Sequence, residues 1–427
     1  MGEEMSTKTR TLATRPAASG ATRWVQLIIG IICMVMIANL QYGWNLFVDP
    51  IDQKYHWGRA AIQVAFTLFI VTETWLVPIE GWFVDRFGPR IVVLLGGVLV
   101  AIAWAVNSKA SSLLVLYTAA VISGIGAGAV SGTCVGNALK WFADRRGLAV
   151  GLTVAGFGAG AALTVVPIAQ MIKANGYEAA FLWFGFGQGL MILILSQFLK
   201  APQPGEVPPS APRLSQTSRH YMPQETLRRP LFWVMYIMFV LVAARGLMIT
   251  AQLASIAVDF GVANAPVTIL GITAMTLPFA LAVDNVLNGL GRPFFGWISD
   301  QIGREVTMCI VFSLGAISIL SLGYLGRSPT LFILLSGAVY FTWGAIYNLF
   351  PATCTDSFGT QYATTNAGML YTAKGTASLL VPLANIVTTT TGSWHAVFVF
   401  VALMDPVAAV MAIAILLPLR RKALSQE

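Results

Sequence analysis

Residues 81–88 read Gly-Trp-Phe-Val-Asp-Arg-Phe-Gly, and residues 296–303 read Gly-Trp-Ile-Ser-Asp-Gln-Ile-Gly. The second stretch begins 215 residues after the first, and both share a Gly, a Trp, an Asp and a final Gly at the same positions. Each follows one long apolar run and precedes another. A repeat at half the chain length predicts a duplicated unit.

The apolar runs on either side of these stretches extend along nearly the whole chain. Hydrophobic residues make up 56% of the sequence and charged residues only 10%, which is too little polar surface for a soluble globule of 427 residues. A helix of about 20 apolar residues crosses about 30 Å of hydrocarbon. The sequence predicts twelve such helices, at 24–46, 59–83, 90–107, 111–139, 148–172, 177–199, 230–258, 266–298, 306–326, 329–355, 365–391 and 394–418.

A proline-rich polar segment, residues 200–229, divides the twelve runs into six and six. We therefore expect an all-α membrane protein with twelve transmembrane helices in two six-helix halves. Its predicted parts are a cytoplasmic N-terminal tail, an N-terminal half, a cytoplasmic linker, a C-terminal half and a cytoplasmic C-terminal tail, at 1–23, 24–199, 200–229, 230–418 and 419–427. Duplicated six-helix units are typical of transporters whose solute site lies between two rocking halves.

The net charge of +8 does not indicate nucleic-acid binding, because the cations lie in short loops and tails between apolar runs. With both termini in the cytoplasm, 18 of the 26 Lys and Arg residues fall on the cytoplasmic side, as the positive-inside rule requires. We expect a multi-pass protein of the cytoplasmic membrane with this orientation, acting as a monomer within the lipid bilayer.

Chemistry other than transport finds no support in the sequence. The four cysteines lie in separate apolar runs, and the three histidines are far apart. Neither set has the spacing of a metal site or of a nucleophilic triad. We expect no metal, no cofactor and no enzymatic activity.

Two cations inside the predicted spans are candidates for substrate binding. A charged residue at mid-bilayer costs about 2.5 to 3.5 kcal/mol on insertion scales, so a charge inside a span indicates a functional or structural role. Arg292 and Lys374 both lie on the order of 9 to 14 Å below the cytoplasmic boundary, from the rise of about 1.5 Å per residue. Arg grips a carboxylate with a planar fork and Lys supplies a point charge, so the pair predicts a dicarboxylate site.

The alternative is that acidic side chains of the protein neutralise these cations. Glu73 and Asp284 are the candidates for this role, and either could instead be the partner of Arg245, a third cation inside a span. Glu73 and Glu80 could also carry protons, since burial favours the neutral form of a carboxyl group. Glu80, near the end of its span, is expected at the membrane interface.

Aromatic and amide side chains accompany these charges in spans expected to line a cavity: Gln41, Tyr42, Trp44, Gln63, Trp343, Tyr347 and Tyr371. Trp343 and Tyr347 are four residues apart and share a helix face. A further pattern, glycine at 124, 128, 132 and 136, forms one stripe along a helix. That stripe predicts close helix packing in lipid and not a nucleotide-binding loop.

The signature Gly-x-x-x-Asp-Arg-x-Gly, with Arg90 following, resembles the loop motif of the major facilitator superfamily. The resemblance covers residues 24–418 and implies that the motif residues bridge neighbouring helix ends and hold the cytoplasmic face shut. It assigns a gating role to Gly81, Asp85, Arg86, Gly88 and Arg90 in the first copy, and to Asp300, Gly303 and Arg304 in the second. The stretch Asp144-Arg-Arg-Gly147 fits the same pattern more weakly.

Several segments resemble one branch of that superfamily, the oxalate/formate antiporter family. They are Gln41-Tyr-Gly-Trp44, Ala65-Phe-Thr-Leu68, Asn288-Gly-Leu-Gly-Arg292, Phe341-Thr-Trp343-Gly and Ala373-Lys374-Gly-Thr-Ala-Ser378. The resemblance implies Arg292 and Lys374 as anion ligands inside a cage of Gln41, Tyr42, Gln63, Trp343 and Tyr347. Tyr371 replaces a Trp of the oxalate carrier, and Glu73 and Glu80 fall where that carrier is uncharged.

These observations lead to one functional hypothesis and two alternatives. The first is exchange of small carboxylates, of the oxalate-for-formate kind, by alternating access. A proton-coupled monocarboxylate symporter would also be consistent with the intramembrane Asp and Arg residues. A membrane sensor on a carrier fold is the third possibility, although we expect no appended domain for signalling.

Overall fold

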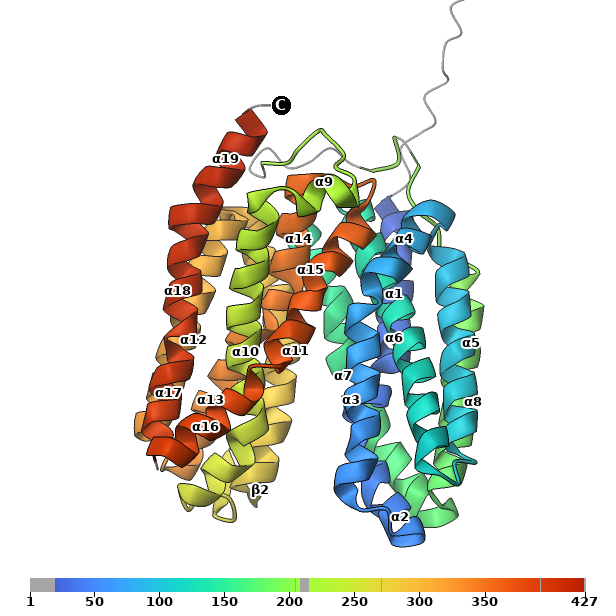
Figure 1. Ribbon diagram of the computed structural model, residues 1–427, viewed down its shortest axis with the longest axis vertical. Helices are drawn as coiled ribbons and strands as arrows, with labels where there is room; N and C mark the ends of the chain where they lie inside the picture. Colours follow the sequence, from blue (N-terminus) through green and yellow to red (C-terminus); the bar gives the residue numbers. More distant parts are fainter. Residues whose placement is uncertain (1–19, 204, 208–214, 270, 392, 426–427) are drawn as a thin grey trace, which may run out of the picture.

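The computed structural model describes residues 20–203, 205–207, 215–269, 271–391 and 393–425. The predicted N-terminal tail therefore lies almost wholly outside the described residues. Long helices run side by side in two bundles that are joined by the segment around the short helix α9, Pro223–Leu227. This segment and the C-terminal helix lie at one end of the molecule (Figure 1). We call this end the linker face.

The first bundle consists of α1 Gly20–Tyr42, α2 Asn45–Tyr55, α3 Arg59–Trp75, α4 Val77–Phe87, α5 Pro89–Asn107, α6 Leu113–Trp141, α7 Arg146–Asn175 and α8 Tyr177–Ser196. The second consists of α10 Pro230–Asp259, α11 Thr276–Ile302, α12 Arg304–Leu325, α13 Pro329–Gly344, α14 Ile346–Phe358, α15 Ala363–Ser378, α16 Val381–Thr391, α17 Trp394–Ala402, α18 Met404–Met411, the π-helical turn η1 Ala412–Leu416 and α19 Leu417–Ser425. Broken spans such as α3–α4 account for the larger number of helical segments.

Nine helical stretches within the described residues are long and apolar enough to cross a membrane, and the bent pair α3–α4 would make a tenth. The two other predicted spans correspond to α11 and to the interrupted pair α15–α16. Helix α11 carries Asp284, Arg292 and Asp300 together with several Asn, Gly and Pro residues, and its low mean hydropathy explains why composition alone does not mark it as a span. The fold is consistent with the twelve predicted spans.

The eighth predicted span begins later than expected. In place of helix from residue 266, the chain forms an antiparallel hairpin of β1 Pro266–Ile269 and β2 Ile272–Met275. The hairpin strands are rich in β-branched residues, and Gly271 has a left-handed backbone with φ of +81°. A short apolar run of β-branched residues has the same hydrophobic pattern as the end of a buried helix, so the pattern does not distinguish the hairpin from the start of a span.

The glycine stripe on α6 packs as predicted. A Cβ atom at Gly124 would collide with Thr72 of α3, and one at Gly132 would press on Val77 of α4. At Gly128 it would lie 2.7 Å from Oε2 of Glu80 and 2.9 Å from the Glu73 carbonyl oxygen. Glycine lets α6 approach the α3–α4 pair to backbone contact, and this contact buries Glu80, which was expected at the membrane interface.

The two bundles touch through a limited set of helices. Helix α7 packs against α11 and α14, and helices α3, α4 and α6 pack against α15. The ribbons of the bundles converge toward the linker face and separate toward the end that carries α2 and the hairpin (Figure 1). The repeated sequence motifs lie at the converging end, because they form the last turns of α4 and α11.

Candidate functional site

The two motif carboxylates cap helices of the opposite bundle. Asp85 on α4 accepts hydrogen bonds from the backbone N–H of Thr365, at 2.8 Å, and from its hydroxyl, at 2.6 Å, in the first turn of α15. Asp300 on α11 accepts hydrogen bonds from the N–H groups of Gly147, at 3.0 Å, and Leu148, at 2.8 Å, in the first turn of α7. A carboxylate at a helix N-terminus satisfies free N–H groups and favours the helix dipole. The duplicated Asp therefore joins the bundles twice, in both directions.

The motif glycines make these contacts sterically possible. A Cβ atom at Gly81 would lie 2.8 Å from the Thr364 backbone of α15, and one at Gly296 would collide with the Gly147 carbonyl of α7. Gly88 and Gly303, the last glycines of the two copies, have φ of +83° and +99° and end α4 and α11. Side chains would oppose both the helix approach and the sharp turn.

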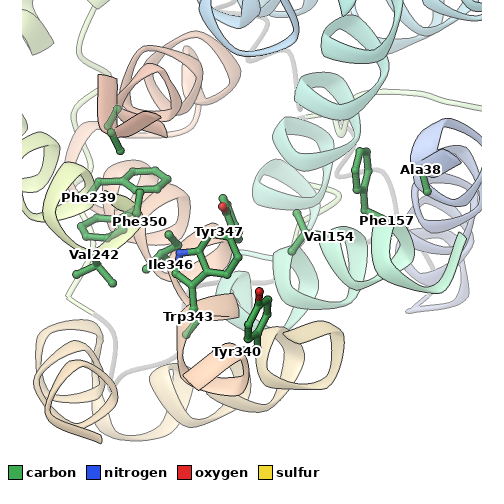
Figure 2. Close-up of a cluster of buried hydrophobic side chains, with 14 of the residues drawn as sticks. Ala38, Val154, Phe157, Phe239, Val242, Tyr340, Trp343, Ile346, Tyr347 and Phe350 are labelled. Carbon is green, nitrogen blue, oxygen red and sulfur yellow. The ribbon is translucent and has the colours of Figure 1, made fainter. Parts of the chain in front are cut away.

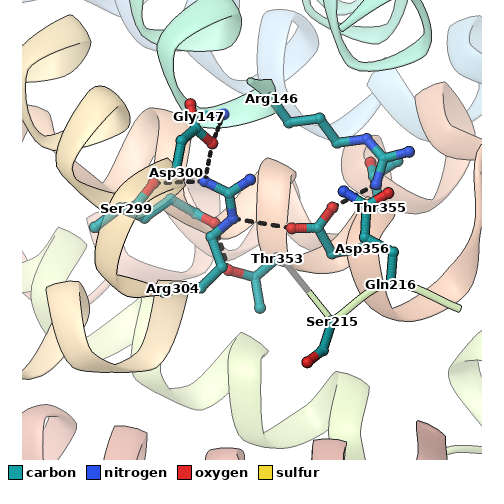
Figure 3. A network of polar contacts seen from close by, with 12 residues as sticks. Arg146, Gly147, Ser215, Gln216, Ser299, Asp300, Arg304, Thr353, Thr355 and Asp356 are labelled. Carbon is teal, nitrogen blue, oxygen red and sulfur yellow. Dashed lines mark hydrogen bonds and ion pairs between the residues drawn. The ribbon is translucent and has the colours of Figure 1, made fainter. Parts of the chain in front are cut away.

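A buried ion network continues the second contact between the bundles (Figure 3). Asp356 on α14 accepts hydrogen bonds from Arg146 of α7 and, at 2.9 Å, from Nε of Arg304. Arg304 also donates to Asp300, at 2.6 Å. Arg420 of α19 binds Glu305, at 2.6 Å, and lies 3.9 Å from Asp356. Sequence reasoning missed Asp356, although an acidic residue at the end of an apolar run was a usable signal.

The arginines of the first motif copy make contacts within their own bundle. Arg86 is exposed and stacks over Trp82 and Phe87, with its guanidinium 5.3 and 5.7 Å from the ring centroids. Arg90 donates to the side-chain oxygen of Gln197 just beyond α8. The cation that pairs with Asp85 is instead Lys140 of α6, at 2.7 Å. The gating role stays a prediction, and these contacts favour Asp85 over the two arginines as its carrier.

Arg292 is buried where the two bundles meet. Its Nη1 donates to the Val154 carbonyl of α7 at 2.5 Å, and its Nη2 donates to the Asn288 side chain at 2.8 Å. Its Nε has no hydrogen-bond partner among the described residues. The residue lies ten positions before the end of α11, about 15 Å from the linker face at 1.5 Å per residue.

Lys374 lies at a similar depth, eleven residues into α15. Its Nζ donates to the Tyr371 hydroxyl at 3.1 Å and lies 3.6 Å from Oε2 of Glu73 on α3. Lys374 therefore has an acidic partner within the protein, Glu73, as the alternative hypothesis predicts. Since α3 and α15 belong to different bundles, this ion pair also crosses between them.

Tyr347 connects the two cations. The Arg292 guanidinium lies 5.1 Å from the Tyr347 ring centroid, and the Lys374 Nζ lies 5.9 Å from it. Trp343 packs edge-on against the same ring at 5.9 Å, and Tyr371 lies 6.3 Å away. Figure 2 shows Trp343 and Tyr347 on the side of their helices that faces Val154 of α7. The same aromatic cluster therefore contacts both cations.

The structure brings the remaining predicted cage residues together only in part. Tyr42, at the end of α1, packs edge-on against Phe157 of α7, with ring centroids 5.4 Å apart. Gln41 beside it is half-buried. Gln63 donates to Asn45 of α2 and lies ten residues before Glu73, about 15 Å along the helix. Gln63 is therefore placed toward the opposite end and not beside the cations.

The third intramembrane cation has a partner that the sequence did not indicate. Arg245 pairs with Asp405 of α18 at 3.2 Å, and both side chains are fully buried. The expected pairing of Arg245 with Asp284 or Glu73 is therefore wrong. Asp284 accepts a hydrogen bond from Ser336 at 2.8 Å instead, and its second oxygen has no partner among the described residues. Helix α10 packs against both α13 and α18, and the contact with α18 brings Asp405 to Arg245.

The profile of the Major Facilitator Superfamily matches residues 27–382, and the fold and the duplicated interdomain motif agree with that match. The chain belongs to the Major Facilitator Superfamily and is a multi-pass membrane transporter. The structure of the proton:xylose symporter XylE bound to 6-bromo-6-deoxy-D-glucose is similar to it, with a TM-score of 0.66 over 93% of this chain and 96% of that one. At 12% identity this likeness shows the fold alone.

Curated relatives include transporters of carboxylates. The chain is 34% identical over 398 residues to the oxalate:formate antiporter of Oxalobacter formigenes, covering 91% of this chain and 90% of the relative. It is 23% identical to monocarboxylate transporter 12-B of Danio rerio, covering 75% of this chain and 72% of that protein. The antiporter is thus the more similar of the two over a larger part of the chain.

Proposed function

We propose that this protein exchanges small carboxylate anions across the membrane by alternating access, in the manner of an oxalate-for-formate antiporter. The observation that carries the proposal is the pair of buried cations, Arg292 and Lys374, whose charged groups lie 5.1 and 5.9 Å from the Tyr347 ring centroid. The likeness to the Oxalobacter antiporter supports the same class of substrate.

The chemistry of the two cations suits a carboxylate. Arg292 keeps its Nε and further N–H donors for an anion after its contacts with Val154 and Asn288. Lys374 contributes a compact ammonium group with three donors, of which Tyr371 accepts one. The aromatic side chains of Trp343 and Tyr347 exclude water from the anion, which strengthens its attraction to both charges.

Alternating access follows from where the bundles are joined. Asp85, Asp300 and Asp356 connect them between the cation pair and the linker face. We assign the linker face to the cytoplasm, because most Lys and Arg residues of the loops and tails would then lie inside. The contacts then close the cytoplasmic side, and breaking them with rearrangement at the opposite end would expose the anion to the cytoplasm.

The test is uptake of radiolabelled oxalate, and in a parallel series of radiolabelled formate, into liposomes that contain the purified protein. The liposomes are preloaded with oxalate, formate, lactate or nothing, with and without a pH gradient. Exchange predicts uptake that requires an internal carboxylate and is independent of the gradient. Absence of carboxylate transport under every condition would refute the proposal.

Arg292→Lys tests the site itself. The variant keeps the charge but loses the fork, and the loss of charge-assisted hydrogen bonds worth about 3 kcal/mol predicts a fall in transport on the order of a hundredfold. Arg59→Lys is the matched control, since Arg59 is exposed and pairs with Asp49 at the opposite end. Equal transport by the two variants would exclude Arg292 as an anion ligand.

Proton-coupled monocarboxylate symport is a second candidate. The Glu73–Lys374 ion pair favours it, because a carboxylate that can exchange its cation for a proton offers a coupling site. Uptake of lactate into empty vesicles, driven by an inward proton gradient, would distinguish symport from exchange.

A further inference from the structure

Glu73 on α3 of the first bundle places a carboxylate in the predicted anion site, whose two cations belong to the second bundle. Its side chain is 2% exposed, and its Oε2 lies 3.6 Å from the Lys374 Nζ. This oxygen accepts no hydrogen bond from the described residues. Oε2 is therefore held beside Lys374 by charge and by the packing of its helix, while Lys374 itself donates to the Tyr371 hydroxyl.

Backbone packing fixes where Glu73 can reach. Its carbonyl lies against Gly128 of α6. Two residues later, the Trp75 indole lies in contact with Gly375, the residue after Lys374. Neighbouring residues of α3 and α15 thus meet directly, so the Glu73 carboxylate stays beside Lys374 for as long as these helices remain together.

The charges around Lys374 can be counted from the residues that face it. Arg292 and Lys374 contribute two positive charges and Glu73 one negative charge, while Tyr347 and Tyr371 are neutral phenols at physiological pH. Glu80, one helix segment after Glu73, is buried and has no cation within ion-pair distance among the described residues. An unpaired buried charge is costly, so Glu80 is counted as neutral. The site carries a net charge of +1.

We propose that Glu73 sets the charge of the transported anion, so that the site is matched to a monocarboxylate. This inference rests on the proposed function of carboxylate transport. Arg292 holds the carboxylate of the substrate, and Glu73 satisfies Lys374 in place of a second substrate carboxylate. A dicarboxylate engages both cations only by displacing Glu73 from Lys374, which leaves a buried carboxylate without a partner.

The experiment compares a dianion with a monoanion in the same variant. Transport of radiolabelled oxalate and of radiolabelled formate is measured in proteoliposomes at one pH above neutrality, where both substrates are fully ionised. Glu73→Gln removes the negative charge with little change of shape. We expect the ratio of oxalate to formate transport efficiency to rise about tenfold or more, because a net charge of +2 favours the dianion.

A matched control separates this effect from loss of any Glu–Lys pair. Glu178→Gln breaks the ion pair with Lys54, at 2.6 Å, near the opposite end of the molecule. This variant should keep the oxalate-to-formate ratio of the parent. Glu73→Asp retains the charge but moves it away from Lys374, so we expect a smaller rise in the oxalate-to-formate ratio than in Glu73→Gln. If Glu73→Gln does not fold, Glu73→Asp provides the test.

The outcomes are distinguishable from failure of the proposed function. A parent protein that transports neither substrate overturns the proposed function. A parent that exchanges carboxylates, with Arg292→Lys inactive and with the oxalate-to-formate ratio unchanged in the Glu73 variants, overturns only the role of Glu73. A falling ratio would show that Glu73 helps a dianion to bind, which also contradicts the proposal.

Discussion

Replacing Asp356 by Asn tests whether the buried ion network holds the linker face shut. Asp356 is fully buried and faces three arginines: Arg146 from the first bundle, and Arg304 and Arg420 from the second. Asparagine has nearly the same shape as aspartate, so the substitution removes charge and leaves the packing in place. Truncating one partner of a buried ion pair costs about 3 to 5 kcal/mol, since the other charge stays buried.

The magnitude follows from the balance of the network. Arg146, Arg304 and Arg420 are matched by three acids, Asp300, Glu305 and Asp356. The variant leaves one positive charge uncompensated, and two charges 4 Å apart interact with about 4 kcal/mol at an effective dielectric constant of about 20. Assigning roughly half of this to the contact between bundles, about 2 kcal/mol, predicts about a thirtyfold shift toward opening at the linker face.

A single cysteine at Thr364 reports that opening. The Thr364 backbone lies against Gly81, and its side chain lies against Gly136, so maleimide reaches it only when the bundles separate. With the four native cysteines replaced, we expect the alkylation rate of Thr364→Cys to rise about thirtyfold in the Asp356→Asn background. The control is Asp405→Asn, which breaks the buried pair with Arg245 inside one bundle.

The control should lower the unfolding temperature without changing the alkylation rate. If both substitutions lower stability but neither accelerates alkylation, the network stabilises the fold without gating it. Equal acceleration in both backgrounds would show that the cysteine reports general loosening, and either result refutes the reasoning.

Two further predictions concern the repeated motif. Asp85→Asn removes the charged cap of α15 and the partner of Lys140. A cap worth about 1 kcal/mol predicts a several-fold faster alkylation of Thr364→Cys. Asp49→Asn, at an exposed position of α2, should leave the alkylation rate unchanged. Gly147→Val places a branched side chain against the Gly296 carbonyl, so the bundles cannot close at the linker face. We expect this variant to be produced at normal yield but to lose carboxylate exchange in proteoliposomes. Gly187→Val is the control, because a Cβ atom at Gly187 meets open space. Retained exchange in Gly147→Val would contradict the packing argument.

The sequence alone determined the class of protein, the order of the spans and the presence of two cations at a similar depth in one half. These features are local: an apolar run of about 20 residues must span lipid whatever surrounds it, and a charge inside such a run is costly wherever it points. The repeated motif likewise identified Asp85 and Asp300, because a duplicated six-helix unit puts both at equivalent helix ends. The hairpin at 266–275 marks the limit of that reasoning, since a short β-branched run fits a strand or a helix end equally well.

Only the tertiary structure decided which charge meets which. Glu73 pairs with Lys374, Arg245 with Asp405, and Asp356 with arginines of both bundles, across as many as 301 positions of the sequence for the first of these pairs. Asp284, the nearer candidate in sequence for Arg245, is held by Ser336 instead. A partner is set by the rotation of each helix and by the order in which the helices pack. Helix rotation and packing order depend on close contacts between spans, such as that of Gly128 with the α3–α4 pair, and the sequence of one span does not determine them.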